Sequence, residues 1–206
     1  MMKARDVCAV LVILVFTVTV YGAEPGAAEA DEAGQGSAAS SVRTYGHWED
    51  PVGVIYDSLN CAPDGSGCDI TFHGTAHWTD VHSEVGGPLL KKSDWKGESN
   101  YAGTAHQETV AFVPQHSTFL EVDTFTGTVE GCGKGSFKFT LAGNVDFTAL
   151  TPNGWPGRGT WEVIEGTGKD GLTGITGGGT STFFFRPTFS NFGDLVGTLI
   201  CHHHQQ

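Results

Sequence analysis

Residues of the types that carry out acid–base chemistry occur in this sequence at alternate positions, which is the spacing of one face of a β-strand. His106 and Glu108 are two residues apart, and Val110 and Phe112 continue the same alternation. Successive side chains of a strand point to opposite faces, so these four side chains would share one face. A histidine and a glutamate on an otherwise apolar face are candidates for a general acid or a general base.

A second set with the same spacing follows shortly after. Glu121 and Asp123 share a face with Phe119 and Phe125 if the segment 118–130 is extended. If this face lines a protein interior, burial raises the pKa of the carboxyl groups and allows proton exchange near neutral pH. The candidate catalytic residues are His106, Glu108 and Asp123.

Two other interpretations of these polar residues stay open. The strand register can place them on the outer face as solvated surface charge, since a shift of one residue inverts every assignment. Alternatively, they pair inside the protein with Arg158 or Arg186 as structural ion pairs.

Aromatic residues are numerous enough to form the wall of a ligand pocket. Tyr101 and Trp95 flank small polar residues typical of a strand end, which favours a place near a pocket mouth. The alternative is that the aromatic side chains are ordinary core. The candidate substrate-binding residues are Trp78, Trp95, Tyr101, Phe119, Glu121, Phe125 and Trp161.

The elements that would position these residues are strands. In 69–79 and 136–147, large apolar residues alternate with polar ones, and glycine clusters separate the segments. Glycine permits the sharp bends that closing a small sheet requires, which favours a barrel over a sandwich. We therefore predict an all-β fold, a single closed antiparallel barrel of about eight strands. Further candidate strands are 42–48, 92–98, 100–113, 158–165, 177–186 and 192–200.

The N-terminal region is typical of an exported protein. Residues 1–22 combine basic residues, a short apolar stretch and small residues before a cleavage site, as secretory signal peptides do. A membrane anchor is the less favoured alternative, because the apolar stretch is short for a span of about 20 residues. Residues 23–41 indicate a disordered linker, 42–201 the β-barrel domain, and 202–206 a His-rich tail. The mature chain is expected to be secreted or extracytoplasmic and free of the membrane.

Four cysteines remain after removal of a signal peptide, an even number that suggests two disulfides with three possible connectivities. We favour Cys61–Cys68, which closes a short turn, and Cys132–Cys201, which ties a glycine-rich hairpin to the last strand.

Composition and motifs exclude several classes of function. With 11 Lys and Arg against 23 Asp and Glu, the chain has a formal net charge of −12, which argues against nucleic acid as a partner. Neither a phosphate-binding loop nor a GxSxG nucleophile motif occurs. His73 and His77 would lie about 13 Å apart on one strand, too far to share a metal ion. No cofactor and no metal are therefore expected.

Two glycine-rich segments resemble a known superfamily. They are Phe125-Thr126-Gly127-Thr128-Val129-Glu130-Gly131-Cys132-Gly133-Lys134-Gly135-Ser136-Phe137 and Gly159-Thr160-Trp161-Glu162-Val163-Ile164-Glu165-Gly166-Thr167-Gly168. Together they resemble the allene oxide cyclase-like small barrels, which include plant allene oxide cyclases, dirigent proteins, an uncharacterised bacterial family and barrels that close polyketide rings. The resemblance covers about 95–185. It departs at Lys169–Gly171, which lengthen the loop after Gly168, and it transfers no catalytic residue.

The resemblance implies an enzyme of natural-product biosynthesis. Its members fold a flexible apolar substrate in the barrel cavity and need no cofactor, so we expect a cyclase or isomerase acting on a polyketide- or lipid-derived molecule. The alternative is a secreted protein that binds an apolar small molecule without turnover; a third is a structural protein with a filled core. A homodimer or homotrimer is expected under all three.

Overall fold

The computed structural model describes residues 38–79, 92–186 and 190–203. The expected signal peptide, most of the expected linker and residues 204–206 of the tail lie outside the described residues. The first strand begins at Ala38 and pairs with His203, so the folded part extends a few residues beyond the expected 42–201 at both ends. In these ranges, no helix is long and apolar enough to cross a membrane.

In the described part of the chain, ten strands form one antiparallel sheet, as the all-β prediction requires. The strands are β1 (Ala38–Asp50), β2 (Ile55–Cys61), β3 (Gly67–Trp78), β4 (Trp95–Val110), β5 (Val113–Val129), β6 (Gly133–Asp146), β7 (Trp155–Val163), β8 (Lys169–Asp170), β9 (Thr176–Phe185) and β10 (Asn191–His203). The candidate strands 92–98 and 100–113 are one continuous strand, β4, and its hairpin partner β5 begins within the second of them.

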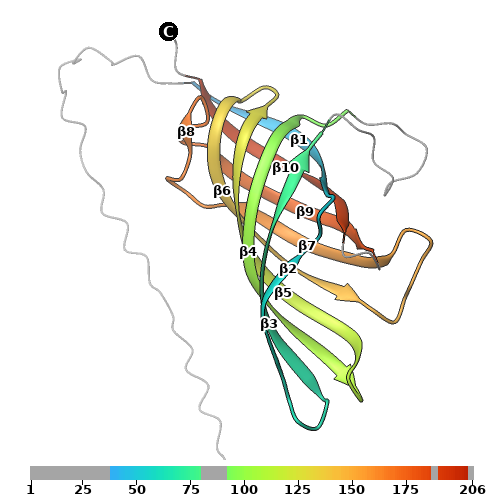
Figure 1. Cartoon of the computed structure of the whole chain (residues 1–206). Helices are drawn as coiled ribbons and strands as arrows, with labels where there is room; N and C mark the ends of the chain where they lie inside the picture. The colour runs from blue at the N-terminus through green and yellow to red at the C-terminus, as the bar shows by residue number, and fades with distance from the viewer. Residues whose placement is uncertain (1–37, 80–91, 187–189, 204–206) are drawn as a thin grey trace, which may run out of the picture. The chain divides into compact units, whose positions relative to one another are not determined.

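The sequence of strand pairings that begins at β1 leads back to β1. Along the sheet the order is β1-β10-β9-β7-β6-β5-β4-β3-β2, and β3 also pairs with β1 at Trp48↔Trp78 and Glu49↔His77. Eight strands therefore form a ring, while β2 extends the sheet from β3 and the short β8 pairs with β6. At one end of this ring the hairpins β2–β3 and β4–β5 extend together (Figure 1).

Alternation of side chains places one face of each strand inside the ring. In β3 the buried residues are the predicted apolar face that runs from Ile70 to Trp78, and its neighbours Thr71 and His73 are exposed. In β6 the same holds for the face that runs from Phe137 to Val145. The period-2 pattern in the sequence therefore identified the inner faces of both strands.

One end of the ring is filled by packed aromatic side chains. Trp95 and Phe125 are completely buried, with ring centroids 5.2 Å apart, and Phe137 packs against both. The segment after β7 closes this end with two buried side chains, Leu172 and Ile175. This end of the interior is therefore occupied by packed side chains.

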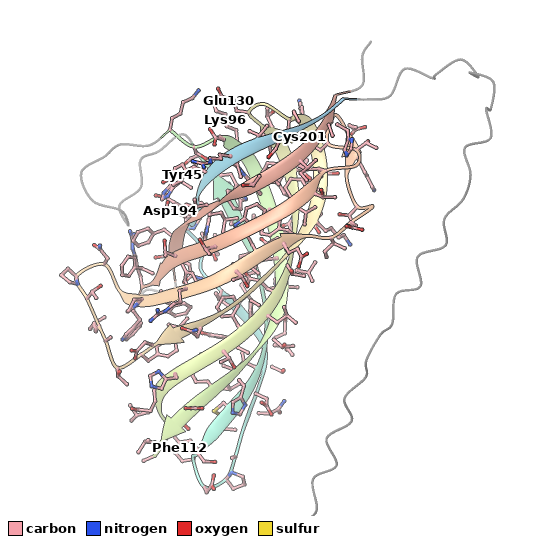
Figure 2. All side chains as sticks on the ribbon, turned by 180° about the vertical axis from the view of Figure 1, so that it is seen from behind. Tyr45, Lys96, Phe112, Glu130, Asp194 and Cys201 are labelled. Atoms are coloured by element: carbon pink, nitrogen blue, oxygen red, sulfur yellow. A yellow bond between two sulfur atoms is a disulfide. The ribbon has the colours of Figure 1, made fainter. Side chains whose placement is uncertain are left out.

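Both predicted disulfides are present. Cys61–Cys68 joins a directly opposite pair of β2 and β3, and Cys132–Cys201 joins the β5–β6 turn to the end of β10. Cys201 lies toward the filled end of the ring, as Glu130 does, and Phe112 marks the opposite end in Figure 2.

Gly74 on β3 is required by a close approach. It lies directly opposite Tyr101 of β4, whose ring crosses over it. A Cβ atom at position 74 would collide with the Tyr101 side chain. The glycine therefore allows the Tyr101 ring to lie against the sheet and turn its hydroxyl toward β1.

Candidate functional site

A cavity of about 90 Å³ occupies the half of the interior nearer the β4–β5 turn. Its walls are mainly aromatic and aliphatic, with contributions from Phe119 of β5, Phe139 of β6 and Phe183 of β9. Tyr56 of β2 also lines it and is 47% exposed.

The polar part of the lining is a hydrogen-bonded chain that starts from a tryptophan. Trp78 Nε1 donates to Ser99 Oγ at 3.0 Å, and Ser99 Oγ donates to Asp123 Oδ1 at 3.0 Å. The indole N–H only donates, so Ser99 Oγ accepts from Trp78 and keeps its own proton to donate to Asp123. Oδ1 of Asp123 is therefore an acceptor.

The second oxygen of Asp123 is the unusual atom of the site. The residue is 4% exposed, and Oδ2 is buried without a hydrogen-bond partner in the described part of the chain. Burial raises the pKa of Asp123 to about 7, against the opposing effect of the hydrogen bond from Ser99. Because Oδ1 accepts from Ser99, a proton on this carboxyl group resides on Oδ2. Asp123 can thus accept or donate a proton through Oδ2 near neutral pH.

Two further carboxyl groups, those of Glu121 and Asp50, belong to the same acidic cluster as Asp123. Burial, together with the charges of Asp123 and Asp50, raises the pKa of Glu121 well above its usual range. The Tyr101 hydroxyl donates to Asp50 Oδ2, and burial and this hydrogen bond raise the Tyr101 pKa. Tyr101 lies directly opposite Asp123 across the β4–β5 pair, so both side chains point into the ring. The site is therefore acidic inside an apolar enclosure.

The expected inward placement of His106 and Glu108 is wrong. Tyr101 points inward, so the even-numbered positions of the same continuous strand point outward. His106 is exposed and its Nδ1 lies 2.7 Å from Asp69 Oδ1 on the outer face. Glu108 is exposed as well. The alternative of solvated surface charge holds for these two residues, and neither reaches the cavity.

Among the described residues, no salt bridge joins Glu121 or Asp123 to Arg158 or Arg186. Arg158 is exposed on β7, and the Arg186 guanidinium lies 4.0 Å from the centre of the Phe192 ring. Glu121 and Asp123 do point inward, as the functional interpretation required.

The aromatic candidates divide into two groups. Tyr101, Phe119 and Trp78 line the cavity, together with Glu121. The other three belong to the packed core instead, which corrects their predicted place in the pocket: Trp95, Phe125 and Trp161. Trp95 donates its indole N–H to Thr44 Oγ1 at 2.6 Å, and Trp161 lies 5.6 Å from Trp95 between ring centroids.

Sequence reasoning missed the contribution of β1 and of β10. Trp48 lines the cavity, and Asp50, two residues further on the same face, binds the Tyr101 hydroxyl. The expected strand 42–48 stopped short of Asp50; continuing its alternation by one step would have found this residue. Asn191, at the start of β10, also lines the cavity, and its Oδ1 is buried without a partner in the described residues. No periodic signal marks Asn191.

The lining suits an organic ligand better than a metal ion. Among the described residues, no group of three or more His, Cys, Asp or Glu side chains is arranged to hold a metal. The cavity instead offers isolated oxygen acceptors within aromatic walls.

Comparisons with known proteins give a similar fold and a partial match to a family model of unknown function. A family model described as a protein of unknown function (DUF3224) matches residues 88–184. The chain is similar to the structure of a protein with unknown function from the DUF3224 family of Shewanella oneidensis MR-1. That likeness has 13% sequence identity and a TM-score of 0.50, and covers 80% of this chain and 100% of that chain. At this identity it shows the fold alone. No curated protein matches.

Proposed function

We propose that this protein binds a compact, largely apolar molecule that carries a hydrogen-bond donor. The observation that carries the proposal is Asp123 Oδ2, a buried acceptor without a partner that belongs to a cavity with aromatic walls. Buried polar atoms in proteins normally have a partner, so an unpartnered acceptor in a cavity lining is suited to a ligand that donates a hydrogen bond. Asn191 Oδ1 is a second acceptor of the same kind.

The size of the cavity limits the ligand. Its volume of about 90 Å³ is below the ~150 Å³ of an engineered apolar cavity that binds benzene. The cavity therefore suits a ligand with a short apolar body, and a longer ligand would not be enclosed by it. This argues for a smaller ligand, or a more exposed one, than a whole polyketide chain.

The experiment is an NMR titration of the ¹⁵N-labelled protein with n-butanol, a small apolar donor. We expect the Trp78 indole signal to shift, because Trp78 donates to Ser99, which holds Asp123. Ala105→Leu, which fills space in the cavity lining, should abolish the shift. Ala102→Leu adds the same bulk at an exposed position of the same strand and should leave it intact. An unchanged Trp78 signal in the native protein would contradict binding.

A second candidate is the cofactor-independent cyclase or isomerase that the sequence predicts. The observation that favours it is the pKa of Asp123, which burial raises to about 7. A carboxyl group with this pKa can both accept and donate a proton near neutral pH. In this interpretation the ring of eight strands acts as a closed barrel of the allene oxide cyclase-like type, and Asp123 is the acid–base residue.

Native mass spectrometry of the protein from its own producer separates the two candidates. A co-purifying small molecule is identified, and the emptied protein is incubated with it. Recovery of the molecule unchanged supports a binding protein. Conversion that is lost in Asp123→Asn supports an enzyme.

We further propose that the protein works outside the cytosol. Two disulfides support this location, because disulfides persist in oxidising compartments. The signal peptide over 1–22 and assembly as a homodimer or homotrimer stay predictions.

A further inference from the structure

The charged groups at the cavity all have the same sign. Glu121 and Asp123 line it, and Asp50 accepts the hydrogen bond of the lining residue Tyr101. Among the described lining residues there is no Lys, Arg or His. A buried carboxylate without a positive partner is unfavourable, which is why the pKa values of Glu121 and Asp123 are raised. The described part of the lining therefore offers no counter-charge to these carboxyl groups.

One atom of the acidic group lacks a hydrogen-bond partner in the described residues. Asp123 is 4% exposed, its Oδ1 is occupied by Ser99, and its Oδ2 has no partner in the described residues. Asp123 lines the cavity, and Oδ2 is the acceptor that its carboxyl group has left for a ligand there.

The rest of the lining is suited to the same kind of ligand. The aromatic residues around the cavity include Trp48, Phe72, Trp78, Tyr101, Phe119 and Phe183. The faces of aromatic rings attract cations, by about 2 kcal/mol or more at sites removed from water. Aromatic walls therefore favour both a positive charge and the apolar body attached to it.

We infer that the cavity selects an organic cation, an ammonium group on a short apolar body, which places its N–H on Asp123 Oδ2. This inference rests on the proposed binding function and names the charge of the ligand. The whole chain supports it, because a formal net charge of −12 raises the concentration of cations near the surface.

A metal ion does not satisfy these observations. Calcium takes six to eight oxygen ligands, and magnesium requires an octahedral shell. The described residues contain no metal-binding cluster, and the cavity walls are mostly carbon. An ammonium ion needs few acceptors, and its apolar body fills the remaining space.

The charge of the ligand has a consequence for pH dependence. The titratable groups that face Asp123 across the cavity are Glu121, Asp50, Tyr101 and Tyr56, of which none is cationic. An ammonium ion favours the ionised carboxylate, so its binding should strengthen as pH rises through about 7, the pKa of Asp123. If Asp123 alone must ionise, the gain between pH 5 and pH 8 approaches about 100-fold.

The test compares three molecules of one size: n-butylammonium, n-butanol and butyrate. Each is titrated into the ¹⁵N-labelled full chain, and dissociation constants are taken from the Trp78 indole signal at pH 5 and pH 8. We expect n-butylammonium to bind about 10-fold or more tightly than n-butanol at pH 8, and to weaken strongly at pH 5. Butyrate should bind worst of the three.

Two variants assign the preference to the site. Asp123→Asn should remove both the preference for the cation and its pH dependence. Glu130→Gln removes the same charge from an exposed residue beyond the filled end of the ring (Figure 2) and should change neither. If Asp123→Asn does not fold, Glu121→Gln replaces it and should reduce the preference.

The possible results are distinct. If n-butanol binds as tightly as n-butylammonium, or if Asp123→Asn keeps the preference, the ligand is not selected by charge, and the inference fails while the proposed function stands. If none of the three molecules shifts the Trp78 signal, both fail.

Discussion

The Ser99 hydroxyl donates to Asp123 Oδ1 across the β4–β5 pair at 3.0 Å. The two residues are diagonal neighbours, because Tyr101, not Ser99, lies directly opposite Asp123. The Ser99 oxygen also accepts from Trp78 Nε1, so the hydroxyl links the indole to the carboxyl group. This arrangement occupies one oxygen of a buried carboxyl group and leaves the other unpartnered, which is the basis of the proposed site.

Stability should fall as pH rises across the range in which Asp123 titrates. Its pKa is about 7 in the folded protein and about 3.9 in an unfolded chain, so the folded state binds the proton more tightly. The stabilisation is complete below pH 4 and is lost as pH rises to about 7, by at most about 4 kcal/mol. Urea unfolding from pH 4 to pH 8 measures this slope. Asp123→Asn should flatten it, and an equal slope in that variant would contradict the assignment.

Removal of the Ser99 hydroxyl should be costly. Ser99→Ala leaves Trp78 Nε1 and Asp123 Oδ1 without partners inside the ring, an expected loss of about 3 kcal/mol. Ser181→Ala is the matched control, because Ser181 is equally buried and its Oγ has no partner in the described residues. Its substitution should be neutral or slightly stabilising. Similar losses in both variants would show that the chain from Trp78 contributes nothing.

The strands and their inner faces were largely predictable from the sequence, because alternation is a local property. The pattern from Ile70 to Trp78 and the shared face of Phe119, Glu121 and Asp123 needed no tertiary information. His106 and Glu108 were misplaced because 92–98 and 100–113 were treated as separate strands. β4 is continuous from Trp95 to Val110. The alternation that points Tyr101 inward therefore points His106 outward.

The composition of the site was less accessible, because it depends on which strands meet. Nothing local shows that Asp50 reaches Tyr101 or that Trp95 is packed while Trp78 lines a cavity. These outcomes follow from the pairing of β3 with β1 and from the way one end of the ring is filled.

Gly74→Ala should disturb Tyr101. The new methyl group collides with the Tyr101 ring and pushes its hydroxyl away from Asp50, with an expected loss of about 1–3 kcal/mol. This loss of stability should depend on the Tyr101 ring. Gly74→Ala should therefore cost less in a protein that already carries Tyr101→Leu. Unfolding of the two single variants and the double variant measures this coupling. Strictly additive losses would mean that Gly74 serves another purpose.

Changes on the outer face should leave the site intact. His106→Ala breaks an exposed pair with Asp69, which is expected to contribute at most about 1 kcal/mol. Glu108→Gln removes a charge that faces solvent. Neither variant should alter the Trp78 indole shift on titration with n-butanol. A loss of binding in either would place the ligand outside the cavity.

The two disulfides should differ in their contribution to stability. Cys132–Cys201 spans 69 residues and Cys61–Cys68 spans 7, so the first restricts the unfolded chain much more. Loop-closure entropy predicts that Cys132→Ala with Cys201→Ala costs about 2 kcal/mol more than Cys61→Ala with Cys68→Ala. Because Cys201 anchors the end of β10, its loss should also expose the filled end of the ring to hydrogen exchange. Chemical unfolding and exchange of the β10 amides test both statements, and an equal cost for the two pairs would contradict the entropic argument.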